Sequence, residues 1–82
     1  MPYGSEFSYT ISSADGNGEY LAVVDWGGVN ATITIYKNGS SIASHSGVGA
    51  YPFFLYDISV SDTIKIVTNV YGTSAYIFKL EY

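Results

Sequence analysis

The stretch EYLAVVDWGG, residues 19–28, decides the fold class of this chain. Successive side chains of a β-strand point to opposite faces, so the residues of this stretch divide into two sets. One face would carry Tyr20, Ala22, Val24 and Trp26, and the other Leu21 and Val23. Because both sets are apolar, the stretch predicts a central strand, and the two glycines that follow predict its end.

The same alternation recurs along the chain, and turn signals separate the segments. The predicted strands cover residues 6–12, 19–26, 31–37, 41–46, 51–60, 63–70 and 75–82. Asn38-Gly39 is the strongest short hairpin signal, because both residues tolerate positive φ. No stretch of ten or more residues shows helical periodicity. The sequence therefore predicts an all-β fold, a single antiparallel β-sandwich or jelly-roll-like domain of about seven or eight short strands.

Several positions within these strands can be assigned to a face or an edge. Ile33 and Ile35 are expected to point inward, as are Ile64 and Ile66. The polar segment 41–46 fits an edge strand. Pro52 lacks an N–H group, so it should lie at a strand start or on an edge.

Composition excludes several classes of function. The chain has 82 residues, three lysines, no arginine and seven acidic residues, and its net charge is −4. Nucleic-acid binding and binding to anionic membranes both need a basic surface, so neither is expected. No apolar run approaches the roughly 20 residues of a membrane-spanning helix. The absence of cysteine excludes disulfides, thiolate zinc sites and a cysteine nucleophile.

The first seven residues, MPYGSEF, form a segment of doubtful origin. Gly4-Ser5 and Glu6-Phe7 are the dipeptides that two common cloning sites encode when they are joined in frame. We therefore interpret residues 1–7 as a candidate cloning-derived leader and residues 8–82 as the single β-sandwich domain. Phe7 would still extend the first strand, because it alternates with Tyr9 and Ile11.

The segment DGNGE, residues 15–19, admits two interpretations. Asp15, Asn17 and Glu19 supply oxygen donors at alternating positions, which is typical of irregular calcium-binding loops. An EF-hand would need glycine at its sixth position and glutamate at its twelfth, where this chain has Tyr20 and Trp26. The alternative is a glycine-containing turn that joins two strands. We expect no required cofactor, with calcium as the one candidate.

No group of residues in the sequence predicts catalysis. His45 is the only histidine, and its neighbours Ser44 and Ser46 would point to the opposite face of a strand. A chain of this size offers little room for the deep cleft that a pair of catalytic carboxylates would need. We therefore expect no enzymatic activity, and a small hydrolase is the minor alternative.

The nine tyrosines are too many for a small core, because a buried hydroxyl needs a hydrogen-bond partner. Some of them must lie on the surface, where aromatic side chains favour contact with proteins or sugar rings. The candidate ligand-binding residues are Tyr36, Tyr51, Tyr56 and Tyr71. The alternative is cross-strand aromatic pairing that only stabilises the sheet.

Three segments together resemble the pre-peptidase C-terminal domain family, the small jelly-roll-like sandwiches appended to secreted bacterial and archaeal proteases. They are YLAVVDWGG at residues 20–28, ATITIYKNGSSIAS at 31–44 and DISVSDTIKIVTNVYGTSAYIFKLEY at 57–82. The resemblance covers residues 9–82. YKNGSSIAS with SDTIKI also looks like the trimeric jelly rolls of the complement and tumour-necrosis-factor type.

These observations predict a non-catalytic extracellular or cell-surface accessory module. It would bind a protein or carbohydrate surface, or stabilise an attached secreted enzyme. The alternative is a structural subunit of a surface filament or viral coat. Such a subunit would form homo-oligomers through its edge strands, since the last strand, YIFKLEY, could pair with another chain.

Overall fold

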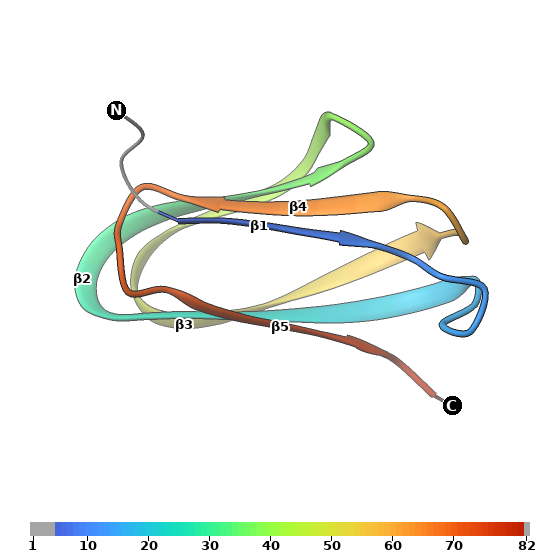
Figure 1. The fold of residues 1–82 in the computed structure, drawn as a ribbon. Coiled ribbons are helices and arrows are strands. Elements are labelled where there is room, and N and C mark those ends of the chain that lie inside the picture. The colour runs from blue at the N-terminus through green and yellow to red at the C-terminus, as the bar shows by residue number, and fades with distance from the viewer. Residues whose placement is uncertain (1–4, 82) are drawn as a thin grey trace.

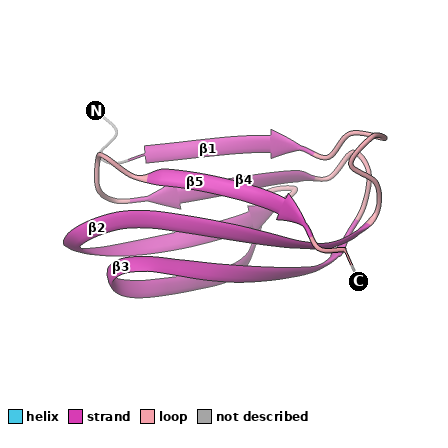
Figure 2. Ribbon diagram, turned by 90° about the horizontal axis from the view of Figure 1, so that it is seen from below, coloured by secondary structure: helices cyan, strands magenta, loops and turns pink. Residues whose placement is uncertain are grey.

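The computed structural model describes residues 5–81, and these residues form five antiparallel strands that belong to one sheet (Figure 1). The strands are β1 (Ser5–Thr10), β2 (Gly18–Lys37), β3 (Ser40–Ile58), β4 (Thr63–Thr68) and β5 (Ser74–Lys79). The described residues contain no helix, and Figure 2 accordingly shows only strands and loops. The all-β prediction is confirmed, and the predicted count of seven or eight strands is corrected to five.

The lower count arises because two pairs of predicted strands are continuous. The predicted strands 19–26 and 31–37 both lie in β2. The predicted strand 41–46 lies in β3, and so does the predicted strand 51–60 apart from residues 59 and 60. The paired strands bend sharply instead of ending, and their register shifts on both sides of Gly27. Gly27 has φ 78° and its partner Gly49 has φ 97°, backbone conformations that glycine adopts without a steric penalty. These glycines therefore bend the hairpin where the sequence suggested a strand end.

The bend folds the sheet over on itself, so that its two halves face each other across the core (Figure 1). One half, which we call the four-strand layer, contains β1, β4, the second part of β2 and the first part of β3. The other half, the three-strand layer, contains β5, the first part of β2 and the second part of β3. β2 is central in both layers, and the two apolar faces of residues 19–26 predicted this for the three-strand layer.

The core lies between the layers and is built from alternating residues of every strand that faces it. The buried apolar residues are Ile11, Tyr20, Ala22, Val24, Trp26, Ala31, Ile33, Ile35, Phe53, Leu55, Ile58, Ile64 and Ile66. The inward positions predicted for Ile33, Ile35, Ile64 and Ile66 are thus confirmed. Tyr20 satisfies its buried hydroxyl by donating to the carbonyl of Gly16 at 2.6 Å. No buried side-chain polar atom among the described residues lacks a partner.

Asn38-Gly39 forms the turn between β2 and β3, as predicted, with φ 52° and 88°. β3 pairs only with β2 among the described strands, so it forms an edge along both layers. Pro52 lies opposite Val23 in this edge strand. Since Val23 directs its backbone groups toward β5 in this register, the missing N–H of Pro52 interrupts no bond to β2.

β1 begins at Ser5, so part of the suspected leader belongs to the folded sheet. Ser5, Glu6 and Phe7 pair with Thr68, Val67 and Ile66 of β4. Phe7 is half-buried and packs against the core. The first four residues of the suspected leader, 1–4, lie outside the described residues, and so does Tyr82, where the last predicted strand would end. A search of residues 5–81 for a helix that could span a membrane finds none.

Candidate functional site

The outer surface of the three-strand layer carries a continuous set of apolar side chains. Leu21 of β2 lies between Phe54 of β3 and Phe78 of β5, and all three point to the same face because they are direct cross-strand partners. One step along the sheet, Val23 lies between Pro52 and Tyr76 in the same way. We call these six residues, Leu21, Val23, Pro52, Phe54, Tyr76 and Phe78, the outer aromatic face.

The three aromatic rings of this face are about half exposed. Phe54 and Phe78 are each 54% exposed, and Tyr76 is 57% exposed. At these fractions each ring presents roughly 100 Å² to solvent. Three rings together reach about 300 Å², which is the size of the largest apolar patch on a typical monomer, and such patches are often functional. Glu19, Asp25 and Ser74 lie at the ends of the rows and give the patch a polar rim.

The loop before β2 is organised by the carboxylate of Asp15. Its Oδ2 accepts hydrogen bonds from the hydroxyl of Tyr9 at 2.5 Å, the amide of Ser12 at 3.0 Å and the hydroxyl of Ser12 at 2.9 Å. The bond from Tyr9, followed by those from Ser12, holds the pKa of Asp15 below its ordinary value. The same bond raises the pKa of Tyr9. Asp15 therefore closes a hydrogen-bonded turn.

The other two candidate calcium ligands point elsewhere. Asn17 Oδ1 accepts a hydrogen bond from the amide of Val60 at 2.7 Å, which ties the loop to the turn before β4. Asn17 and Glu19 line a surface depression together with Asp57, and Asp15 does not contribute to it. Within residues 5–81, no three acidic, histidine or cysteine side chains gather in a group that could hold a metal ion. The geometry favours the turn, and calcium binding stays a prediction.

His45 belongs to an aromatic cluster beside the bend. Its ring stacks on that of Tyr51 with the ring centroids 3.8 Å apart. The ring centroid of Trp26 lies 6.1 Å from that of His45. Tyr51 in turn meets Phe53 edge to face at 4.9 Å. The indole of Trp26 donates to the carbonyl of Gly47 at 2.9 Å. The only histidine thus packs where β3 turns from one layer to the other.

The structure separates the four tyrosines proposed as ligand contacts. Tyr36 lies in β2 with Lys65 Nζ 5.8 Å from the centre of its ring, and Tyr51 stacks on His45. Tyr71 lies in the loop between β4 and β5 and is 58% exposed. Tyr56, which is 62% exposed, lies two residues beyond Phe54 in β3. Only Tyr56 is therefore a direct neighbour of the outer aromatic face.

Of the six residues that the sheet brings together here, the sequence alone places Leu21 and Val23 on a shared face, the second face of the 19–26 strand. The signal was the apolar character of both faces of residues 19–26, because an apolar second face favours contact with another surface. Cross-strand register then decides which other residues join it, and register is not visible in single strands.

No protein-family model matches this chain, and neither a curated protein nor a solved structure is significantly similar to it.

Proposed function

We propose that this chain is a non-catalytic binding module and that its outer aromatic face packs against the surface of a protein. The observation that carries the proposal is the unbroken apolar arrangement across three strands, with Leu21 between Phe54 and Phe78 and Val23 between Pro52 and Tyr76. Protein interfaces have an apolar, aromatic centre and a polar rim, which is the distribution on this face. A protein is favoured over a sugar because none of these six side chains except Tyr76 can form a hydrogen bond.

The folded sheet fits a jelly-roll-like sandwich, the architecture of the pre-peptidase C-terminal domains that the sequence resembles. That resemblance implies a module attached to a secreted enzyme. The low content of charged residues, 12%, is compatible with an extracellular or cell-surface location. In that setting the outer aromatic face would bind either the attached enzyme or the protein on which the enzyme acts.

Cosedimentation with insoluble polymers tests this proposal. The probes are collagen fibrils as an extended protein surface, and cellulose and chitin as carbohydrate surfaces. The test variant is the double substitution Phe54→Ser with Phe78→Ser, which removes both rings beside Leu21. The matched control is Val29→Ser, because Val29 is 50% exposed but lies in the bend, outside the outer aromatic face.

Saturable sedimentation with collagen that falls at least tenfold in the double variant and is unchanged in Val29→Ser would support the proposal. Binding to cellulose or chitin with the same dependence would replace the protein ligand by a carbohydrate. Equal binding of all three proteins, or no binding to any polymer by a monomeric wild-type chain, would contradict the proposal.

A structural subunit that assembles through strand edges is the second candidate. The observation that favours it is the length of β3, a strand of 19 residues that pairs with β2 and with no other described strand. Edges of this kind can pair with a second chain. Light scattering over a concentration series tests the idea. Growth in mass with concentration would favour assembly, and a constant monomer mass would count against it.

A further inference from the structure

The two layers do not end at the same place on the side of β1 and β5. The four-strand layer continues past β4 to β1, whereas the three-strand layer stops at β5. In Figure 2, β1 accordingly extends beyond β5 at the margin of the molecule. β1 and β5 are not paired with each other. One strand position beside β5 and under β1 is thus vacant in the described part of the chain.

The outer edge of β5 carries backbone groups that no described strand pairs. The amide of Leu80 donates to the carbonyl of Glu19 at 2.9 Å, which makes these two residues a hydrogen-bonded pair. Hydrogen-bonded pairs alternate in an antiparallel ladder, so Phe78 and Tyr76 also direct their backbone groups toward β2. Ala75, Ile77 and Lys79 must therefore direct their N–H and C=O groups outward, where an added strand could bond to them.

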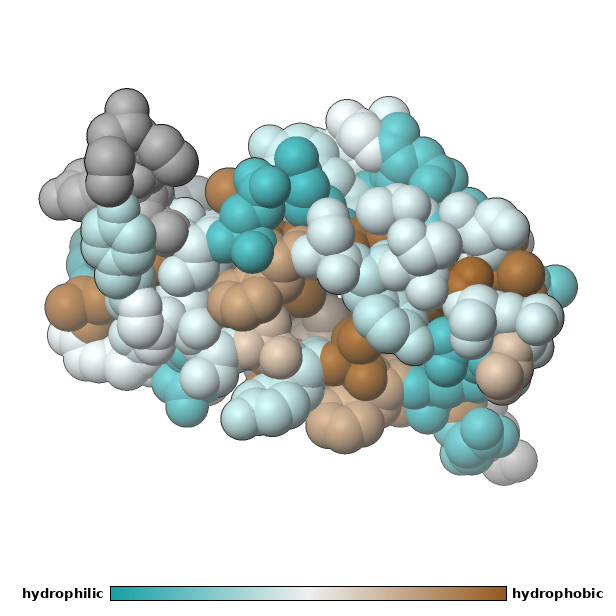
Figure 3. Space-filling view, viewed as in Figure 1, coloured by the Kyte–Doolittle hydropathy of each residue, from teal (hydrophilic) through white to brown (hydrophobic). Residues whose placement is uncertain are grey.

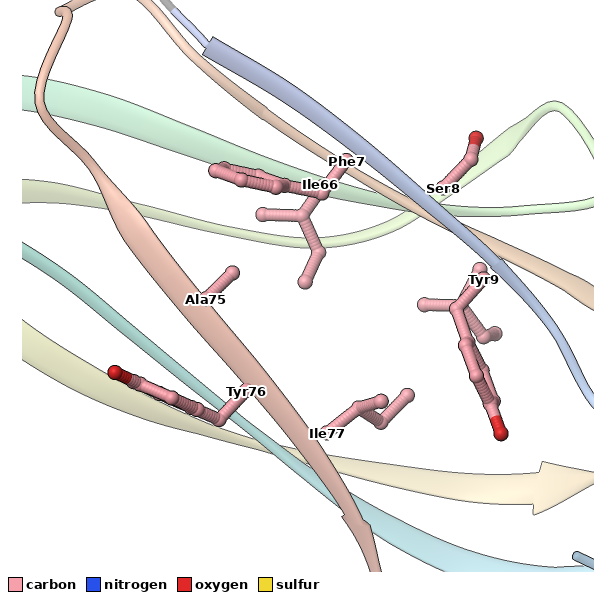
Figure 4. A pocket seen from close by; sticks show the side chains of 8 residues that line it. Phe7, Ser8, Tyr9, Ile66, Ala75, Tyr76 and Ile77 are labelled. Carbon is pink, nitrogen blue, oxygen red and sulfur yellow. The ribbon is translucent and has the colours of Figure 1, made fainter.

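The vacant position adjoins an apolar groove of about 210 Å³. Figure 4 shows Ala75 of β5 pointing into it toward Ile66 and Ile77 of β5 pointing into it toward Tyr9, whereas Ser8 and Tyr76 point away. Figure 3 shows a band of hydrophobic surface between the layers on this side of the molecule. A groove of this size, open to solvent, is filled by water in the free protein. An apolar lining gives these waters few partners, so their displacement by apolar side chains is favourable.

The charge of the chain indicates which kind of strand the groove accepts. The net charge is −4, and each of the three lysines lies near an acidic residue of the fold. Lys65 lies 3.8 Å from Glu6, Lys37 donates to the carbonyl of Asp57, and the charge of Lys79 acts on Asp15. A basic partner is therefore attracted to this protein, and an acidic one is repelled.

We propose that the groove between β1 and β5 binds an extended peptide segment in which apolar and basic residues alternate. The segment pairs with the outward backbone groups of Ala75, Ile77 and Lys79 and becomes a fourth strand of its layer. Its apolar side chains cover Phe7 and Ile77, and its basic side chains remain in solvent. This site is separate from the outer aromatic face, so the two proposals can fail independently.

The probe is a blocked seven-residue peptide in which lysine alternates with valine and isoleucine. Seven residues in a strand span about 23 Å, enough to cover the six residues of β5. Four control peptides isolate the three parts of the proposal. The first replaces lysine by glutamate, and the second keeps the composition but groups the apolar residues together. The other two carry N-methyl groups on alternate backbone nitrogens, one peptide for each edge of the strand.

Binding is measured by amide NMR of the labelled protein. We expect saturable shifts centred on β5 and slowed hydrogen exchange at Ala75, Ile77 and Lys79. We also expect affinity at least tenfold weaker for the glutamate and grouped peptides. The peptide methylated on the edge that faces β5 should not bind, and the peptide methylated on the opposite edge should still bind. Absence of saturable shifts with the alternating lysine peptide, or equal binding of all peptides, would overturn the proposal.

A pair of protein variants tests whether the peptide binds in the groove beside β5. Ala75→Lys places an inward charge in the groove, a feature that natural edge strands use to prevent pairing. Ser74→Lys adds the same charge one residue earlier on the exposed face. Binding should fall at least tenfold in Ala75→Lys and remain in Ser74→Lys. Equal binding by both variants would place the peptide elsewhere. If wild type dimerises without peptide and Ala75→Lys does not, the occupant is a second copy, and the proposal is wrong.

Discussion

The side chain of Asn38 donates from Nδ2 to Oδ1 of Asp62 at 2.9 Å and so joins the β2–β3 turn to the start of β4. Two further bonds strengthen the link. Thr63 donates its amide to Oδ1 of Asn38, and Asn38 donates its own amide to the carbonyl of Thr63, both at 2.9 Å. A residue chosen for its turn conformation thus also fixes the position of the next strand.

Substitution of Asn38 separates these two roles. Asn38→Gly keeps the φ of 52° available and loses only the side-chain bonds, whereas Asn38→Ala loses the bonds and also strains the turn. We expect both variants to be less stable than wild type. The free energy of unfolding of the alanine variant should be lower than that of the glycine variant by about 1–2 kcal/mol. This is the cost of a left-handed conformation for a residue with Cβ. Urea unfolding measures the difference, and equal stability of the two variants would contradict it.

Acid should weaken the same link. The hydrogen bond from Asn38, with that from the amide of Ser59, lowers the pKa of Asp62 below 3.8. Because the folded-state pKa is depressed, Asp62 contributes stability at pH values above 3.8, and this is lost as the pH falls through the lowered pKa. Thermal melts should show Asp62→Ala less stable than wild type at pH 7, with a smaller difference at pH 2. A difference that does not change with pH would exclude this linkage.

The hydrogen bond between Tyr9 and Asp15 should make stability depend on pH in the alkaline range. Their hydrogen bond raises the pKa of Tyr9 above 10.0. A raised folded-state pKa gives stability that is fully present below pH 10.0 and is lost as the pH rises through the raised value. We therefore expect Tyr9→Phe to lose less stability than wild type between pH 9 and pH 12. NMR titration of the Tyr9 ring checks the cause, since Asp15→Asn should bring its pKa closer to 10.0.

The two glycines of the bend make a matched pair. A Cβ at Gly27 or at Gly28 would meet nothing within 4 Å, so packing does not distinguish them. Only Gly27 has a left-handed φ, 78°. Gly27→Ala should cost about 1–2 kcal/mol in the free energy of unfolding. Gly28→Ala should be neutral or stabilising by up to about 1 kcal/mol, because it restricts only the unfolded chain. A loss of unfolding free energy that is larger in Gly28→Ala than in Gly27→Ala would contradict the assignment of the bend to Gly27.

The indole of Trp26 should stabilise the same bend from the inside. Trp26 is 4% exposed, and its Nε1 donates to the carbonyl of Gly47. Trp26→Phe keeps an aromatic ring but removes the donor, and we expect a loss of about 0.5–1.5 kcal/mol from the hydrogen bond alone. Denaturant unfolding measures the loss. Val48→Ala is the control, because Val48 lies in the same bend but is 62% exposed and should change stability little.

The sequence by itself determined the all-β class, the Asn38-Gly39 turn and the inward positions of four core residues. Alternation placed Ile33, Ile35, Ile64 and Ile66 inward, and the positive-φ tolerance of Asn38-Gly39 located the hairpin. These features depend on residues that are neighbours in sequence, where the period of a strand and the conformational range of a residue are sufficient. The same local reasoning identified the DGNGE segment, in which Asp15 bonds within the turn.

Only the tertiary structure decided which strands continue through a bend and which side chains meet across strands. Gly27-Gly28 is compatible with a strand end or with a sharp bend, and the choice depends on whether β3 bends with β2. The outer aromatic face depends on register, which sets Phe54 and Phe78 on either side of Leu21. The groove depends on strand order, which gives β1 no partner opposite it in the three-strand layer. Register and order are set by packing between segments far apart in the chain, so no single segment encodes them.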